Sequence, residues 1–538
     1  MTVFSLPATQ ADIHAAFFDS KSAADWLCRL PQANTSAMLS ALLAQIQLLN
    51  TSSMPAAERF SILETLRNTL FHVSAGCQRR YENKPLPLLP EEQLALNAVR
   101  DLWRKCTVAY LHCLQACLDQ DTSISGHSAI VAHRALSCLR MEQMNSYLAL
   151  SEPGADFWHL LHTVFAAAER LATTLEPVAD KRLGETREST LSGQYAMALM
   201  LHLVDPFSMP RKQFATVTRW LARWRELANI SAQPESGPNT CGVSLDFAHD
   251  HPIQRPLQTH CDARWLSLNN VLRKINKRII LLNAGESPEN LKLGSGLSRA
   301  SCVSLLERLS LHLRFPQPRD IQTRSESVHV AAGLENMFLA LGGKGLKTPK
   351  SSSLYGSKIH ADKLAIFGQV VEAIADETVQ SEEWQLLDID TDTACLQRTI
   401  NGGDARLVLN GFLAIQWPPS KHYVLTSITR IASRDTESGT RLDVVVKRLG
   451  GKPLARVAES REKGTGKNMR YPALLLSPEA GDHTPASIIL PSGVSIRAAS
   501  IRYYDQEMRV SLDLQRAELI ERNSDCERWS LCCLVPEI

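Results

Sequence analysis

The pattern of the sequence changes near residue 350, and this change constrains the fold more than any single motif does. Before it, apolar residues recur at three- and four-residue spacing, as at Leu39, Leu42 and Ile46, which is the period of an α-helix. After it, short segments rich in Val, Ile and Tyr are separated by turn residues such as the Asn-Gly-Gly at 401–403. Each half must bury its own apolar side chains. The chain is therefore predicted to be multidomain, with an N-terminal α-helical array followed by a small antiparallel β-barrel.

We expect three parts along the chain: an α-helical domain over residues 1–341, a basic linker over 342–363 and a β-barrel domain over 364–538. Beyond the first hundred residues, helices are predicted over 128–150, 157–175, 190–203, 211–229, 263–282 and 299–313. Two short extended segments, 243–247 and 327–334, are expected to decorate the helical domain.

Composition and charge exclude several classes of protein. The 58 basic and 56 acidic residues leave a formal charge of +2, which argues against a chain that coats nucleic acid or anionic lipid over its whole surface. The longest strongly apolar stretch, 196–204, is far shorter than the ~20 residues of a membrane span, and the N-terminal residues do not have the pattern of a secretory signal. We therefore expect a cytoplasmic protein that does not insert into a membrane.

No catalytic motif is present, since a nucleophile elbow, an H-E-x-x-H helix and a dinucleotide fingerprint are all missing. The Cys and His residues between 241 and 261 lack the paired spacing of a structural zinc site. We expect neither an enzyme nor a bound metal or cofactor.

Basic residues form two candidate features in the second half. Arg430 and Arg434 make an Arg-x-x-x-Arg pair, and a spacing of four along a strand puts both on one face, where they either contact a phosphate or a guanine edge or lie at a solvated strand end. Between residues 441 and 470, nine basic residues face three acidic ones, which indicates either an anion-binding stretch or a solvated hairpin loop. In the first half, Trp220 and Trp224 beside arginines indicate either a partner face or core packing.

The succession of predicted strands over 411–417, 423–433 and 441–449 resembles that of the PilZ family of bacterial cyclic di-GMP receptors. The run Asp388-x-Asp390-x-x-Thr393 lies where that family carries its Asp-x-Ser-x-x-Gly signature. The N-terminal segments WLCRLP (26–31) and RFSILE (59–64) are similar to the helical leader of divergent proteobacterial members.

This resemblance implies a bacterial signalling protein of degenerate PilZ type that binds cyclic di-GMP as a ligand and acts through a protein partner of its helical domain. The ligand-binding residues that it implies are Arg430, Arg434, Asp388, Asp390, Lys358 and Lys363. Three departures from the family leave nucleotide binding either weakened, shifted or lost. Asp stands at 390 where the family usually has Ser, and Thr stands at 393 where it usually has Gly. The family carries an Arg-x-x-x-Arg element before the first barrel strand. The linker expected at that place has five lysines and no arginine over 344–363.

Two alternatives stay open. The first is a ligand-free protein-interaction scaffold. The second is an RNA-binding barrel that uses the basic stretch from 441 to 470, although we do not expect nucleic acid to be the partner of a chain with so little net charge.

Overall fold

The computed structural model of the chain describes residues 3–182, 187–233, 242–246, 263–314, 326–343, 379–400, 403–420, 422–436, 439–461, 468–478, 485–494, 499–505, 508–513, 517–523 and 525–531. The chain divides into two compact units. The helical unit comprises Met1–Lys84, Leu88–Asp320 and Ala432–Ser438, and the β unit comprises Pro85–Pro87, Ile321–Ile431 and Gly439–Ile538. The predicted order of helical array and β structure is confirmed, but the β unit begins at Ile321, ahead of the boundary predicted at residue 341.

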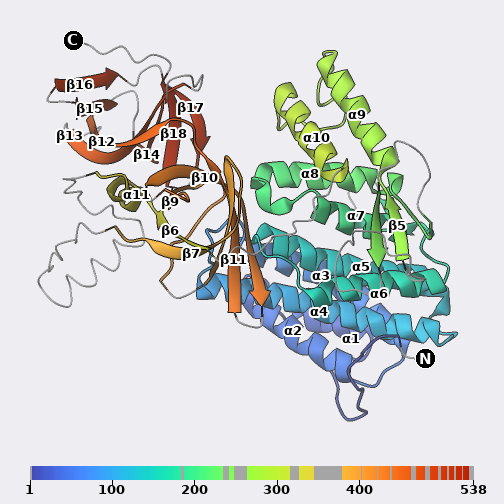
Figure 1. The fold of residues 1–538 in the computed structure, drawn as a ribbon. Helices are drawn as coiled ribbons and strands as arrows, with labels where there is room; N and C mark the ends of the chain where they lie inside the picture. Colours follow the sequence, from blue (N-terminus) through green and yellow to red (C-terminus); the bar gives the residue numbers. More distant parts are fainter. Residues whose placement is uncertain are drawn as a thin grey trace, which may run out of the picture. The chain divides into compact units, whose positions relative to one another are not determined.

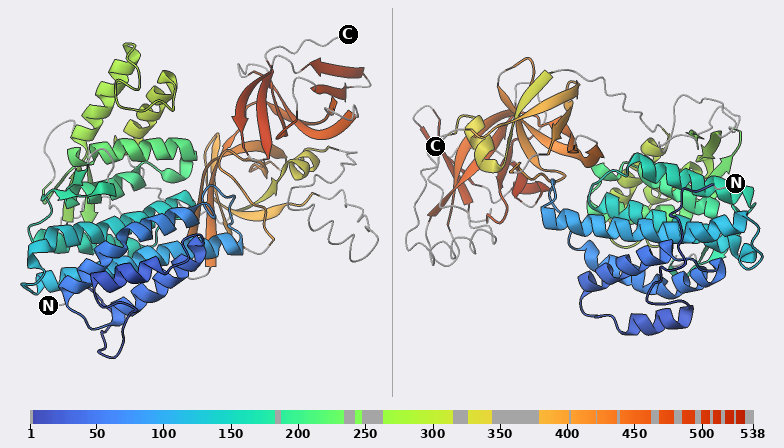
Figure 2. Two further views of the ribbon diagram at one scale, coloured as in Figure 1. Left: turned by 180° about the vertical axis from the view of Figure 1, so that it is seen from behind. Right: turned by 90° about the horizontal axis from the view of Figure 1, so that it is seen from below.

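Helices make up most of the helical unit. They are α1 (Ser20–Cys28), α2 (Thr35–Thr51), α3 (Ala56–Gln78), α4 (Pro90–Leu118), α5 (Ser128–Leu148), α6 (Ala155–Arg170), α7 (Leu191–Leu203), α8 (Arg211–Trp224), α9 (Asn269–Asn283) and α10 (Arg299–Arg314). The long helices α2 to α6 lie side by side and form the body of the unit (Figure 1, Figure 2).

Local sequence signals set where these helices begin. Helix α4 has Pro90 at its first position, and the Glu92 carboxylate accepts a hydrogen bond of 2.8 Å from the Leu89 backbone N–H. The side chain of Asn34 caps α2 by accepting a hydrogen bond of 3.0 Å from the Ala37 N–H.

Helix α7 lies in the centre of the apolar core, and all of its residues except His202 are buried. A helix that is apolar on every side must be covered on every side, which explains its position. Among the described helices, none combines the length and the apolar character that crossing a bilayer requires.

The two tryptophans of α8 belong to the core. Trp220 and Trp224 are 1% and 5% exposed, and their rings stack with centroids 6.1 Å apart. The Trp220 indole N–H donates a hydrogen bond of 2.9 Å to the Leu293 carbonyl oxygen. Core packing, rather than a partner face, is therefore the role that their spacing indicates.

Two small sheets accompany the helices. Strands β1 (Val178–Ala179) and β2 (Glu188–Ser189) pair with each other, and β3 (Asn229–Ser231), β5 (Ala263–Ser267) and β4 (Gly242–Asp246) form an antiparallel sheet in that order. The strand predicted near 243 is confirmed. The helix predicted from residue 263 instead starts at Asn269, because residues 263–267 pair with strands on both sides and bury Leu266.

The first part of the β unit is a closed antiparallel barrel in the order β10-β11-β8-β7-β6-β9. Its strands are β6 (Glu326–Ala332), β7 (Glu382–Ile389), β8 (Thr393–Thr399), β9 (Phe412–Gln416), β10 (Tyr423–Thr436) and β11 (Gly439–Arg448). Strand β6 pairs with β7 and β9, so the segment expected to decorate the helical domain is the first barrel strand. The segment from 342 to 363 consequently joins the first two strands of the barrel and does not precede it.

The second part of the β unit is a seven-stranded sheet in the order β16-β15-β12-β13-β14-β18-β17. Its strands are β12 (Lys452–Arg461), β13 (Asn468–Ser477), β14 (Ser487–Pro491), β15 (Ala499–Asp505), β16 (Met508–Asp513), β17 (Ala517–Arg522) and β18 (Cys526–Leu531). The prediction of one barrel over 364–538 thus needs correction, since a barrel and a second sheet share this region. Helix α11 (Leu334–Ala340) places Met337 and Phe338 in an apolar cluster with residues of both sheets.

Most of the basic stretch from 441 to 470 forms strands, whereas residues 462–467, the centre of the expected hairpin loop, lie outside the described residues. Its residues lie mainly in strands β11, β12 and β13, and β12 and β13 pair in register from Lys452 opposite Ser477 to Arg461 opposite Asn468. Alternating side chains of a strand point to opposite faces, so pairing distributes these cations over both sides of the sheet.

Candidate functional site

The run that resembles the family signature forms the exposed turn between β7 and β8. The Asp390 backbone N–H donates a hydrogen bond of 2.8 Å to the Thr393 carbonyl oxygen, which closes the turn. The Asp390 carboxylate accepts hydrogen bonds from the Thr391 N–H at 2.7 Å and from its hydroxyl at 3.2 Å. The Asp388 carboxylate accepts one of 2.9 Å from the Ile389 N–H. Both carboxylates are exposed, so each keeps lone pairs that can accept hydrogen bonds from a ligand.

Two cations of β11 lie next to this turn. Lys447 is directly opposite Thr393 in the β8–β11 pairing, and the Arg448 N–H donates a hydrogen bond of 2.7 Å to the Asp392 carbonyl oxygen. Both side chains are exposed. Directly opposed residues have Cβ atoms about 5 Å apart, which brings a cation within reach of an anion held at the turn. Sequence reasoning did not single out this pair, and only the pairing of β8 with β11 reveals it.

Strand β6 starts near the same turn. Glu326 pairs with Leu386, two residues before Asp388. The segment that leads into the first barrel strand is therefore 315–325, which contains Arg319 and Arg324. The placement of 315–325 lies outside the described residues, as does that of Lys358 and Lys363.

Arg430 and Arg434 both lie on β10, and their surroundings differ. Arg434 lies in the last part of β10, which belongs to the helical unit. Its Nε donates a hydrogen bond of 2.9 Å to a carboxylate oxygen of Glu152. Arg430 is half-buried in the β unit. Strands β11 and β8 lie between β10 and β7, so Arg430 and the turn carboxylates belong to strands on opposite sides of the closed barrel.

The opposite end of the barrel holds a buried ion pair. Arg398 is 7% exposed, its guanidinium lies 4.8 Å from the centroid of the Trp384 ring, and it pairs with Glu382. The Trp384 indole N–H donates a hydrogen bond of 2.9 Å to the same carboxylate. This cluster pairs the Arg398 charge with Glu382 but leaves the Arg398 Nε without an acceptor among the described residues.

A cavity of about 440 Å³ adjoins this cluster. Its charged lining comprises three acidic residues, Glu382, Glu383 and Asp404, and two basic ones, Arg398 and Arg441. This balance does not favour a doubly anionic ligand, so the β7–β8 end of the barrel is the better candidate for a nucleotide.

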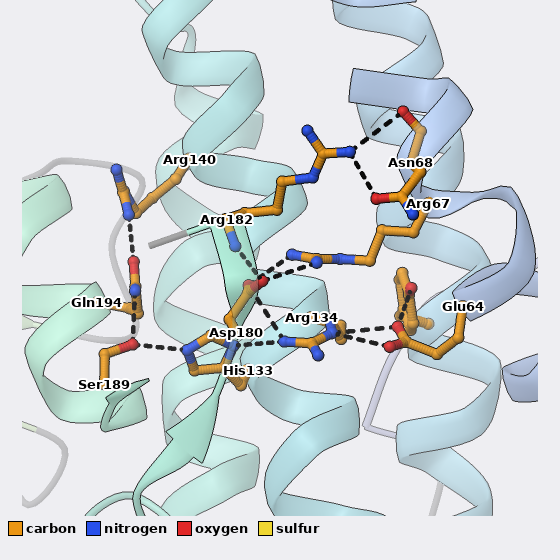
Figure 3. A network of polar contacts seen from close by, with 11 residues as sticks. Glu64, Arg67, Asn68, His133, Arg134, Arg140, Asp180, Arg182, Ser189 and Gln194 are labelled. Atoms are coloured by element: carbon orange, nitrogen blue, oxygen red, sulfur yellow. Dashed lines mark hydrogen bonds and ion pairs between the residues drawn. The ribbon is translucent and has the colours of Figure 1, made fainter. Parts of the chain in front are cut away.

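The helical unit contains a second polar centre, shown in Figure 3, that joins α3, α5 and the β1–β2 hairpin. Arg67 donates two hydrogen bonds to the Asp180 carboxylate, at 2.9 and 2.6 Å. Arg134 donates to Asp180 at 3.3 Å and to Glu64 at 3.1 Å, and the Tyr110 hydroxyl donates to Glu64 at 2.9 Å.

Charge pairing governs the protonation of this centre. Burial alone raises the pKa of the Asp180 carboxyl, but the hydrogen bonds from Arg67 and the Arg182 N–H outweigh it, and the pKa lies below its ordinary value. Burial and the charge of Arg134 lower the pKa of His133 to about 3, so its ring is neutral at ordinary pH. The neutral ring shares a hydrogen bond of 2.7 Å with the Ser189 hydroxyl. The network therefore fixes the hairpin to the helices and has a structural role.

No group of three or more Cys, His, Asp or Glu side chains in the described part of the chain could hold a metal ion. The cysteines and histidines between 241 and 261 that were considered as ligands lie outside that part.

These features define a class of protein with a long helical domain, a six-stranded antiparallel barrel and an exposed turn between β7 and β8. Residues 21–235, from α1 to just past β3, match the family described as "Cyclic-di-GMP receptor FimW, N-terminal domain". This match and the barrel confirm the resemblance to divergent PilZ-type receptors with a long N-terminal helical region. No curated protein and no solved structure matches the chain.

Proposed function

We propose that the chain is a cytoplasmic bacterial signalling protein that binds cyclic di-GMP at the β7–β8 end of its barrel and acts through a protein partner of its helical domain. The observation that carries this function is the match of the helical domain to a cyclic di-GMP receptor family in a chain whose barrel exposes the signature turn. Its role is one of binding and not of catalysis.

In the proposed site, guanine edges and phosphates have separate partners. The N1–H and N2–H groups of guanine donate hydrogen bonds to the carboxylates of Asp388 and Asp390. The phosphates bind the cations beside the turn, namely Lys447 and Arg448, together with arginines of the 315–325 segment. Arg430, Arg434, Lys358 and Lys363 are further candidates from the resemblance. A ligand that binds one conformational state better than another shifts the population toward it, and this shift changes how the helical domain engages its partner.

Titration calorimetry with cyclic di-GMP on the full chain tests the site. We expect K447A/R448A and D388A/D390A to weaken binding by about tenfold or more, because each removes charge-assisted contacts worth about 1.5–3 kcal/mol apiece. The matched control is R441A, which removes a cation at the opposite end of the same strand. Equal loss in R441A and K447A/R448A would contradict the proposed position of the site.

A ligand-free scaffold is the second candidate function. The departures at Asp390 and Thr393 favour it, as does the engagement of Arg434 by Glu152. The variant R430A/R434A distinguishes this scaffold from a receptor that binds its ligand through Arg430 and Arg434, as the family resemblance implies. Such a receptor would lose affinity for the dinucleotide, whereas a scaffold would be unaffected.

A further inference from the structure

Helix α9 carries a row of positive charge on its outer side. The face consists of Arg273, Lys274, Lys277 and Arg278, and no acidic residue occurs within Asn269–Asn283. The apolar positions of the helix, including Val271, Leu272, Ile275 and Leu282, are buried in the domain. We call these four cations the α9 cationic face. Figure 1 shows that α9 and α10 project beyond α8 from the helical unit.

The cations of this face repel one another. Residues 273 and 277, and likewise 274 and 278, are like-charge pairs at a spacing of four, which destabilises a helix by a few tenths of a kcal/mol per pair. Burial and then the nearby charges of Arg278, Lys277 and Lys292 lower the pKa of Lys274. Such a concentration of charge favours the binding of an anionic partner.

Carboxylates in the described part of the chain do not pair with this face. Among the described residues, none of the four cations forms an ion pair. The Arg278 Nε is a buried donor without a hydrogen-bond acceptor in that part of the chain.

A large apolar side chain lies within the same surface. Ile280 is 67% exposed and follows Lys277 by three residues and Arg273 by seven, so all three share one side of the helix. An exposed isoleucine among cations gains nothing from a phosphate backbone, which offers only charge. A membrane surface requires a broad apolar face, whereas the other large apolar residues of α9 are buried or, for Ile279 and Leu281, half-buried against the core. A protein surface with both acidic and apolar side chains fits both features.

We propose that the α9 cationic face, with Ile280, docks an acidic amphipathic segment of a partner protein. Carboxylates of the partner pair with the four cations, and an apolar side chain packs on Ile280. This inference deepens the proposed function, because it gives the receptor the surface through which its helical domain engages a partner.

The test uses a fluorescein-labelled acidic amphipathic peptide that has Glu on one face and Leu on the other. Its binding to the full chain is measured by fluorescence anisotropy. We expect K274E/K277E/R278E to bind the peptide about tenfold more weakly than the wild type, and binding to fall between about 50 and 200 mM salt. I280S is expected to lose about threefold, since it removes the apolar contact but keeps the charges. The matched control K21E/K212E reverses two exposed lysines in the first turns of α1 and α8 and should bind as the wild type does.

The reversal makes 273 and 277 an attractive pair and leaves 274 and 278 a like-charge pair, so the stability of α9 should change little and the variant should fold, which its circular dichroism checks. Equal peptide binding by the triple variant and the control would overturn the inference. Tighter wild-type binding to an RNA oligonucleotide or to phosphatidylglycerol vesicles at the same salt would also overturn it. The triple variant should bind cyclic di-GMP as the wild type does, so a failure of peptide docking is distinguishable from a failure of the nucleotide site.

Discussion

Replacing Asp180 by Asn tests whether the buried network of the helical domain stabilises the fold. Asp180 is only 4% exposed. Its carboxylate accepts hydrogen bonds from Arg67 through both oxygens, from Arg134 through Oδ2 and from the Arg182 backbone N–H through Oδ1. Asn keeps one acceptor oxygen, while its amide NH₂ points donors at the donors of Arg67 and Arg134.

The cost follows from the contacts that are lost. Two charge-assisted hydrogen bonds, at 2.6 Å to Arg67 and 3.3 Å to Arg134, disappear at Oδ2. Each is worth about 1.5–3 kcal/mol, and the half-buried Arg67 guanidinium loses its counter-charge, whereas Arg134 keeps that of Glu64. We expect D180N to lower the free energy of unfolding of the helical unit by about 3–5 kcal/mol.

Urea titration followed by far-UV circular dichroism measures this change. The matched control is D101N, because Asp101 pairs with Lys105 at 2.8 Å on α4 but is 48% exposed, and its loss should cost about 0.5 kcal/mol or less. The pKa of Asp180 is depressed in the fold, so its contribution is present above pH 3.8 and is lost as the pH falls through the folded pKa. If D180N unfolds within about 1 kcal/mol of the wild type at neutral pH, the network does not stabilise the domain in this way.

Three further predictions concern other sites. The pKa of His133 is lowered from 6.5 to about 3, so the contribution of its neutral ring to folding stability is present above pH 6.5 and is lost as the pH falls toward 3. We expect H133Q to reduce the slope of the unfolding free energy against pH in that window by up to about 1.4 kcal/mol per pH unit. An unchanged slope would count against a buried neutral ring. R398M removes a cation that stacks on Trp384 and pairs with Glu382, and should lower the free energy of unfolding of the β unit by about 2 kcal/mol. The control K452M changes an exposed lysine and should leave this free energy unchanged. T393G restores the glycine of the family signature while it keeps both carboxylates of the turn, and should tighten cyclic di-GMP binding by about tenfold in calorimetry, which a weaker or unchanged affinity would refute.

Local pattern predicted most of the architecture. Apolar periodicity located the helices, and alternation located the barrel strands from 382 onward, because both patterns lie within single elements. Strand β6 was misassigned because its partners β7 and β9 lie far along the chain, and no local signal reveals pairing across such a distance. The same reason hid the pairing of β12 with β13, which turns much of the basic stretch after residue 451 into strands.

The polar sites were less predictable. The turn at Asp388–Asp390 was located by its likeness to a signature, whereas Lys447 became its neighbour only through strand pairing. The network around Asp180 draws on α3, α5 and the β1–β2 hairpin, which are separated by many residues. One signal was available, since Arg134 interrupts an apolar helical stretch where a buried charge requires a partner.

Calorimetric titration of the folded full-length chain with cyclic di-GMP tests the central claim most directly. The account predicts saturable binding with a dissociation constant of about 1–100 μM, weakened by K447A/R448A and spared by R441A. A folded protein that releases no binding heat at several hundred micromolar dinucleotide, and whose melting temperature the dinucleotide does not raise, would contradict it.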